Sequence, residues 1–360
     1  MAEMWINMGP QHPFTHGLWN LRVKADGETI TDAEPILGYL HRGWEKSCEH
    51  RTYPQIIPLS DRLCYGSSMS WAHLYCLTIE ELMDLEVPER AEYIRVIVLE
   101  LQRIASHLMW LAAFGTDLGC LTLMLYCMRE RELFLDLLQG VTGARMTYNY
   151  PRIGGVRNDF PDNFERDTLR VLDHFENKLD DYENLCDGSR IFRIRTEGLG
   201  ILKPEDAKNL GVTGPNLRGS AVRLDLRKND PYSVYDELDW EVAWHDACDT
   251  YARYRVRMDE FRISCDIIRQ AFKKMPKGPI RVKAPRKAPE GSAVARVEDP
   301  RGEGLMYVVS DGSDTPYRLK VRSPVFIYVA AAPYILKGHK IADVPSIMGS
   351  IDMCLGETDR

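Results

Sequence analysis

The chain has 360 residues, with 46 basic and 53 acidic side chains and a net charge of −7. This balance argues against general nucleic-acid binding, because the chain has no overall attraction to phosphate backbones. A hydrophobic content of 44% is enough to bury a core and excludes a disordered chain. Nine scattered cysteines and the absence of a signal peptide predict a reduced, cytoplasmic protein without a disulfide framework.

The first elements expected are strands in residues 4–38, with Asp26-Gly27 as a hairpin turn. Two apolar helices should then meet at Gly115–Asp117. The first begins at Val87-Pro88-Glu89, and the second runs from near Thr116 to about Gln139. Both are apolar nearly all round, so we expect them in the middle of a helical bundle, not as a membrane span broken at its centre.

The second half of the chain predicts further helices and a small sheet. A charged amphipathic helix is expected over 161–187, a short one from Pro204, and the longest over about 236–274. Residues 276–289 are a basic linker, and strands follow at 294–298, 304–310 and 316–322. The predicted class is α+β: a central buried helical bundle with small N- and C-terminal β-sheets. We divide it into residues 1–75, 76–275 and 276–360.

Standard cofactor motifs are missing from the sequence. It contains no glycine-rich dinucleotide motif, no phosphate-binding loop, no serine nucleophile elbow and no intact C-x-x-C pair. We therefore expect no cofactor bound by this chain alone. If the protein handles electrons, a partner must hold the redox group.

Some local features remain open on the residues alone. His12 and His16 have the spacing of a helical metal pair, but Pro10, Pro13 and Gly17 forbid a regular helix there. These histidines could cap backbone groups or face a ligand. Asp117, an acid between two apolar helices, needs a partner. Arg42 could form an ordinary salt bridge, and Tyr65 could be a core residue.

Taken in order, the motifs resemble one family, the quinone-site D subunit of the NADH–quinone oxidoreductases of respiratory complex I. This family is related to the large subunit of [NiFe] hydrogenases, which implies a hydrogenase large-subunit-like fold. The resemblance spans essentially the whole chain. The motifs that carry it are G-P-Q-H-P-F-T-H-G at 9–17, G-Y-L-H-R-G-W-E-K at 38–46, D-R-L-C-Y at 61–65, M-R-E-R-E at 128–132, G-A-R-M at 143–146, V-V-S-D-G at 308–312, P-Y-R at 316–318, K-G-H at 337–339 and G-E-T-D-R at 356–360.

The resemblance implies a partner subunit that holds a [4Fe–4S] cluster, with a long apolar quinone cavity between the two subunits. His16 and Tyr65 would contact the quinone head group, and Asp117 would pair with His16. Arg42 and Arg62 would lie towards the cluster. A proton lost from His16 would leave Asp117 unpaired, a plausible trigger for movement towards the proton-pumping membrane arm. The chain itself would be peripheral, at the cytoplasmic face of the membrane, among further peripheral-arm and membrane-arm subunits.

Two departures from related patterns refine this expectation. The hydrogenase cysteine pairs read Cys64-x-x-Ser67 and Cys354-x-x-Glu357, so the metal-bound hydrogenase alternative is disfavoured and no metal is expected. Thr147 stands where many quinone-reducing relatives have a histidine facing the partner's cluster. This favours a low-potential acceptor such as menaquinone or methanophenazine over ubiquinone, and an electron source other than NADH, such as reduced deazaflavin or ferredoxin. NADH stays among the possible donors because the family uses it. A purely structural scaffold is a third possibility, which the combination of His16, Tyr65 and Asp117 argues against.

Overall fold

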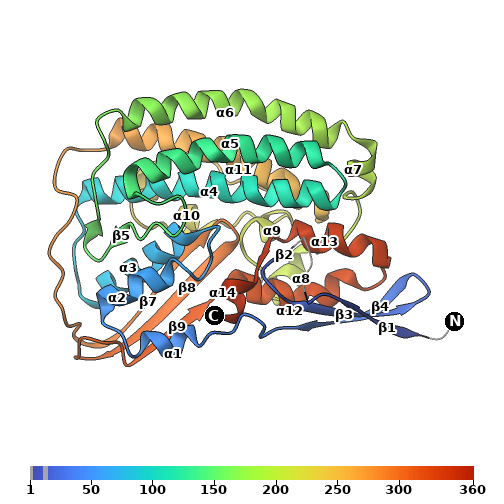
Figure 1. Ribbon diagram of the computed structural model, residues 1–360, viewed down its shortest axis with the longest axis horizontal. Coiled ribbons are helices and arrows are strands. Elements are labelled where there is room, and N and C mark those ends of the chain that lie inside the picture. The colour runs from blue at the N-terminus through green and yellow to red at the C-terminus, as the bar shows by residue number, and fades with distance from the viewer. Residues whose placement is uncertain (1–2, 11–14) are drawn as a thin grey trace.

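The computed structural model describes residues 3–10 and 15–360 and has an α+β architecture, as predicted. The four longest helices pack against one another as a bundle, and the sheets and shorter helices lie against one side of this bundle (Figure 1). The elements are β1 (Met4–Met8), β2 (Thr15–His16), β3 (Asn20–Asp26), β4 (Thr29–Ile36), α1 (Trp44–Cys48), α2 (Tyr53–Ser60), α3 (Ser68–Leu82), α4 (Glu89–Asp117), α5 (Leu121–Thr142), β5 (Pro151–Arg152), β6 (Gly155–Val156), α6 (Phe164–Asp187), α7 (Arg190–Ile194), α8 (Pro204–Asn209), α9 (Gly214–Arg218), α10 (Leu226–Asn229), the 3-10 turn η1 (Tyr235–Glu237), α11 (Thr250–Lys274), β7 (Glu290–Asp299), β8 (Gly302–Asp311), β9 (Arg318–Arg322), α12 (Pro324–Leu336), the 3-10 turn η2 (Ile341–Asp343), α13 (Val344–Ser350), β10 (Met353–Cys354) and α14 (Leu355–Asp359).

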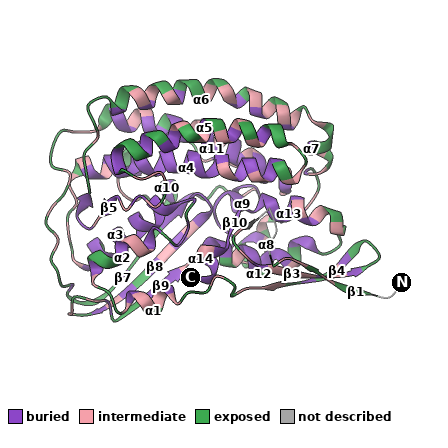
Figure 2. Ribbon diagram, in the orientation of Figure 1, coloured by how far each residue is buried: buried purple, intermediate pink, exposed green. Residues whose placement is uncertain are grey.

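The central pair of helices is confirmed, with shifted ends. Helix α4 starts directly after Pro88, as predicted, and is buried along most of its length (Figure 2). Helix α5 begins at Leu121, not near Thr116, and continues to Thr142, past the predicted end at Gln139. Asp117 is therefore the last residue of α4 and does not open the next helix. Gly143, with φ of 79°, ends α5 in the left-handed conformation that glycine adopts without strain.

The buried middle of α4 carries charges that are satisfied by other elements. The Glu100 carboxylate accepts hydrogen bonds from Arg227 at 3.1 Å, Tyr235 at 2.6 Å and Ser264 at 2.6 Å. His107 lies 2.6 Å from a carboxylate oxygen of Glu260 on α11. A buried charge is tolerated only when it is paired and hydrogen-bonded, so these contacts fix how α4, α10 and α11 pack together.

The predicted helix over 236–274 is wrong in its first third. Only residues 250–274 form α11, because Asp249 caps the helix and its side chain accepts a hydrogen bond from the Ala252 backbone. Cys248, directly before the cap, has φ of 63°, which no continuing helix allows. The aromatic spacing upstream therefore reflects packing in an irregular segment. Trp240, for example, is buried beneath the Arg227 guanidinium, 4.8 Å from the ring centre.

The small sheets match the predicted strands. The N-terminal sheet has the order β1-β3-β4, and the hairpin at Asp26-Gly27 pairs Asp26 with Thr29. The C-terminal sheet is the predicted meander, β7-β8-β9, and Asp311-Gly312 follows its second strand. A shorter pairing joins the two ends of the chain: β2 and β10 run parallel, with Cys354 opposite His16.

Three hydrophobic cores hold these layers together. The first joins the long helices, the second joins α3 to the C-terminal sheet, and the third joins the N-terminal sheet to α12 and α13. The chain's last residues lie near the centre of the molecule (Figure 1). Within the described residues, α4 is the one helix long and apolar enough to cross a membrane, and 89% of its most apolar stretch is buried.

Candidate functional site

Tyr65 and His16 form a hydrogen-bonded pair from distant parts of the chain. Tyr65 lies in the turn between α2 and α3, and its hydroxyl is 2.9 Å from His16 Nδ1. The two rings meet edge to face, with centres 5.7 Å apart. Tyr65 remains 39% exposed, although burial of its hydroxyl raises its pKa. The pair therefore presents a neutral phenol at the surface of the chain, and its contact with a quinone head group stays a prediction.

Local backbone constraints hold His16 in this place. His16 pairs with Cys354 through the short parallel strands β2 and β10. The next residue, Gly17, has φ of +108°, and a Cβ there would lie 2.5 Å from Leu40 Cδ1. Only glycine combines that backbone angle with this close approach. The turn after His16 therefore depends on a residue without a side chain.

The acid that contacts His16 is Asp352, which the sequence did not single out. His16 Nε2 lies 3.4 Å from Asp352 Oδ1, and Arg301 Nη2 lies 3.2 Å from the same oxygen. Asp352 and Arg301 are both fully buried. Burial opposes ionisation of Asp352, but Arg301 and then His16 outweigh it and hold the Asp352 pKa well below its usual range. A fixed negative charge therefore stands behind the His16–Tyr65 pair.

The predicted pairing of His16 with Asp117 is wrong. In the described part of the chain, the acid paired with His16 is Asp352. Asp117 ends α4 and is half-buried, and its Oδ2 atom has no hydrogen-bond partner among the described residues. Burial raises the Asp117 pKa to about 6. The sequence singled out Asp117 because it lies between two apolar helices, but it gave no sign that the fold brings Asp352 to His16.

The arginines expected to face the partner's cluster lie together at the surface. Arg42 Nη2 donates to the Arg62 carbonyl at 2.6 Å and to the Gly356 carbonyl at 3.3 Å. Arg62 Nη1 donates to the Pro58 carbonyl at 2.6 Å. Both arginines are exposed. Because their hydrogen bonds go to carbonyls, no carboxylate in these contacts neutralises their charges.

Thr147 lies in a loop tied to the same region. It has φ of 52°, in the left-handed range, and is half-buried. Two residues further on, the Asn149 backbone donates a hydrogen bond to the carboxylate of Asp61, the neighbour of Arg62. Asp61 is buried, and this raises its pKa to about 7. The sequence around Asp61 gives no signal of this burial, because the loop that covers it comes from a distant segment.

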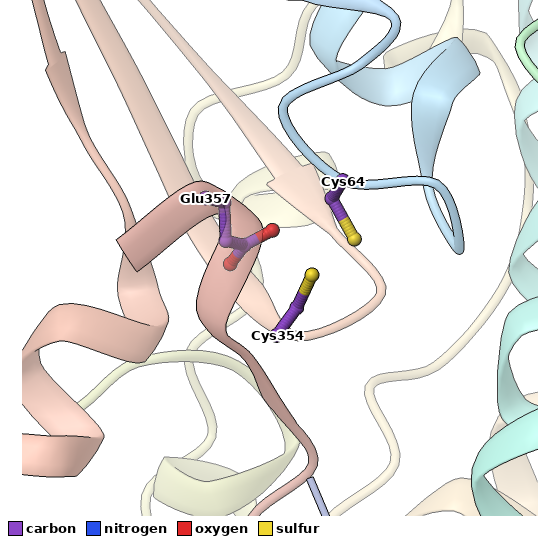
Figure 3. Close-up of side chains that lie close together, drawn as sticks. All are labelled: Cys64, Cys354 and Glu357. Carbon is purple, nitrogen blue, oxygen red and sulfur yellow. The ribbon is translucent and has the colours of Figure 1, made fainter. Parts of the chain in front are cut away.

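The two incomplete cysteine pairs meet inside the protein. Cys64, Cys354 and Glu357 are buried, and their ligand atoms all lie within 4.8 Å of one another. Figure 3 shows the two sulfur atoms pointing towards each other, with the Glu357 carboxylate beside them. The remaining position of the two pairs, Ser67, is buried as well. His12, the other half of the histidine pair noted in the sequence, lies outside the described residues.

A cavity of about 510 Å³ lies beside Arg42, lined by Gly38, His41, Glu45, Phe326 and Arg360, among others. Neither Tyr65 nor His16 lines it. The predicted apolar tunnel was expected between this chain and a partner, so it stays a prediction.

Comparison with known proteins supports the resemblance. A family model described as "Respiratory-chain NADH dehydrogenase, 49 Kd subunit" matches residues 117–288 and 283–360. The NADH-quinone oxidoreductase D subunit of Dehalococcoides mccartyi (strain ATCC BAA-2266 / KCTC 15142 / 195) is 49% identical over 358 residues, covering 99% of this chain and 98% of that protein. The protein of the same name from Geobacillus kaustophilus (strain HTA426) is 47% identical over 360 residues, with the same coverage.

A solved structure has the same fold over nearly the whole chain. It belongs to "the membrane-bound sulfane sulfur reductase (MBS), an archaeal respiratory membrane complex" and matches with a TM-score of 0.95 at 36% identity, covering 99% of this chain and 98% of that chain. Together with the relatives, this confirms the family expected from the motifs. The chain belongs to the family of the 49 Kd subunit of the respiratory-chain NADH dehydrogenase.

Proposed function

We propose that this chain is the quinone-site subunit of a proton-translocating, complex I-like oxidoreductase. The observation that carries the proposal is the Tyr65–His16 pair, with donor and acceptor atoms 2.9 Å apart and a buried Asp352–Arg301 pair behind it. Reduction of a quinone to a quinol adds two electrons and two protons, and its carbonyl oxygens need donors as charge develops on them. The pair supplies one of these protons at the surface, and the imidazole behind it restores the hydroxyl; the second proton comes from outside the pair.

The geometry supports a short proton relay. With His16 protonated, its Nε2–H faces Asp352 and its Nδ1–H donates to the Tyr65 oxygen. The Tyr65 hydroxyl hydrogen is then free to donate to a quinone carbonyl. When Tyr65 gives this proton to the substrate, His16 replaces it from Nδ1. The carboxylate of Asp352 faces the protonated imidazole before this step and a neutral imidazole after it.

We propose that the loss of the His16 proton beside Asp352 is the step that couples quinone reduction to a membrane arm. In this step Asp352 takes the role that was expected of Asp117. The acid is already paired with Arg301, so it does not become an isolated charge when His16 is neutral. Any conformational signal would therefore run through Arg301 and its neighbours. Loss of Asp352 should therefore lower quinone reduction and proton transport together, because both steps use this acid.

We propose that electrons enter from a [4Fe–4S] cluster held by an iron–sulfur partner subunit. Three features support an electron entry face: the exposed Arg42, the exposed Arg62 and the nearby Thr147 loop. Thr147 has no titratable proton, so the cluster potential should be low and nearly independent of pH. This favours menaquinone or methanophenazine as the acceptor, and reduced deazaflavin or ferredoxin over NADH as the donor. The assembled complex would sit at the cytoplasmic face of the membrane.

The Tyr65→Phe variant of the assembled complex tests the proposal. Removing the hydroxyl removes the proton donor, so quinone reduction should fall by about 100-fold or more while the subunits still assemble. Tyr317→Phe is the control, because Tyr317 is 68% exposed and lies directly before β9 in the C-terminal sheet. A Tyr65→Phe complex that reduces quinone at the normal rate would contradict the proposal and leave a scaffold role.

A further inference from the structure

The buried Cys64–Cys354–Glu357 cluster is not used by the proposed quinone chemistry. Its three ligand atoms come from two parts of the chain nearly 300 residues apart and lie within 4.8 Å of one another. Tetrahedral zinc holds sulfur at about 2.3 Å and oxygen at about 2.0–2.2 Å, which places neighbouring ligand atoms about 3.5–3.8 Å apart. The side chains therefore need to move by roughly 1 Å at most to close around an ion. We propose that Cys64, Cys354 and Glu357 bind a zinc ion.

The ligand types favour zinc over harder cations. Thiolates select zinc and other soft or borderline metals, and zinc also accepts one carboxylate oxygen. Magnesium and calcium prefer an all-oxygen set, which two cysteines do not provide. Three protein ligands leave a fourth position, which a water molecule or the nearby buried Ser67 hydroxyl could fill.

The Glu357 carboxylate is already oriented as a metal ligand would be. The Ser323 hydroxyl donates to Oε1 at 2.9 Å, and the Trp71 indole donates to Oε2 at 3.1 Å. All three residues are buried. Ligating carboxylates are usually fixed by such outer hydrogen bonds, and each oxygen keeps a lone pair for the ion.

Arg301 offsets part of the charge of the proposed site. Two thiolates, one carboxylate and a divalent ion carry a net charge of −1, and the Arg301 guanidinium, which also pairs with Asp352, reduces the cost of burying it. The Arg301 guanidinium lies against the loop that holds Cys64, because a Cβ on Gly66 would come within 3.1 Å of its Nη2. Its Nε atom is buried without a hydrogen-bond partner among the described residues. A buried donor without a partner needs an explanation, and the thiolates of the proposed site, with which Arg301 interacts electrostatically, supply negative charge for this guanidinium.

A zinc ion at this place would act as a structural clamp for the quinone site. Cys64 precedes Tyr65 directly, and Cys354 is paired with His16 across β2 and β10. The ion would therefore join the two backbone segments that carry the hydroxyl and the imidazole. This inference extends the proposed function but does not depend on it, because binding can be measured without any quinone.

The test uses the full chain, purified without oxygen and loaded with Zn²⁺. One zinc per chain should bind, and X-ray absorption at the zinc edge should show two sulfur ligands at about 2.3 Å. Cys64→Ser and Cys354→Ser should each lose this zinc, whereas Cys265→Ser, which removes a buried thiol on α11, should keep it. The absorption spectrum is measured on the unmodified chain, so this part of the test does not depend on whether a variant folds.

Three results would overturn the inference. They are zinc below stoichiometric amounts, zinc without sulfur ligands, and a Cys64–Cys354 disulfide in the purified chain, seen as a loss of two hydrogen masses. None of these readouts measures quinone reduction. The zinc site and the proposed function can therefore fail separately.

Discussion

Replacement of Asp352 by asparagine is the sharpest perturbation of the site. Asparagine keeps the size of the side chain and removes its charge. The backbone at Asp352 has φ of 54°, and asparagine tolerates this left-handed conformation well. The variant should therefore fold around the same backbone and change only the charge that faces His16 and Arg301.

The structure sets the size of the effect. Arg301 is fully buried, and besides its ion pair with Asp352 its side chain makes a long hydrogen bond of 3.5 Å to the Ser106 hydroxyl. Breaking a buried ion pair by removing one partner costs about 3–5 kcal/mol of folding free energy. The loss of the carboxylate also removes the charge that faces His16 Nε2. Because His16 restores the donated proton, and a positioned proton donor contributes about 10²–10⁴-fold to a rate, quinone reduction should fall by up to that order.

Asp117→Asn is the matched control for this experiment. Asp117 is half-buried and makes no contact with His16, so its neutral variant should keep the rate within a fewfold. Both variants are compared in the assembled complex for quinone reduction, and in the purified chain for thermal unfolding. A normal rate for Asp352→Asn together with a large loss for Asp117→Asn would refute this reasoning and restore the pairing expected from the sequence.

Other variants test other parts of the account. Gly17→Ala should lower the free energy of unfolding by about 1–3 kcal/mol, because alanine is strained at φ of +108°; an unchanged melting temperature would contradict this. Asp61 has a pKa of about 7 in the fold against an ordinary value of 3.8, so its contribution to stability is present below about pH 4 and is lost as the pH rises through 7. Asp61→Asn should remove that loss, worth up to about 4 kcal/mol, and melting curves at pH 5 and 8 should then differ less than for the unmodified chain. Thr147→His should make the potential of the partner's cluster vary with pH by up to about 60 mV per unit near the histidine pKa, as followed by redox titration; a potential still independent of pH would count against the placement of this loop near the cluster.

The fold was largely predictable where local signals agree with packing. Pro88 and the following acids mark the start of α4, and Asp26-Gly27 marks a hairpin, because both signals act through the backbone nearby. The start of α11 was missed because tryptophan and tyrosine spacing looks helical upstream. The Asp249 cap and the left-handed Cys248 stop the helix there, and the irregular segment buries Trp240 against Arg227.

The site was half predictable. His16 and Tyr65 lie 49 positions apart, and their pairing followed from the resemblance. Asp352 carries no local signal, because it lies in a short apolar segment whose role depends on the pairing of β10 with β2. The meeting of Cys64 with Cys354 likewise depends on tertiary structure, although both were noted as remnants of cysteine pairs. Contacts between distant segments are what single-sequence reasoning lacks.

The position of the quinone head group in the assembled complex tests the central claim most directly. A cryo-electron microscopy map with bound quinone should show one carbonyl oxygen about 2.7–3 Å from the Tyr65 hydroxyl, with His16 and Asp352 behind it. A head group bound away from Tyr65 and His16, with both side chains still paired as they are here, would contradict the claim.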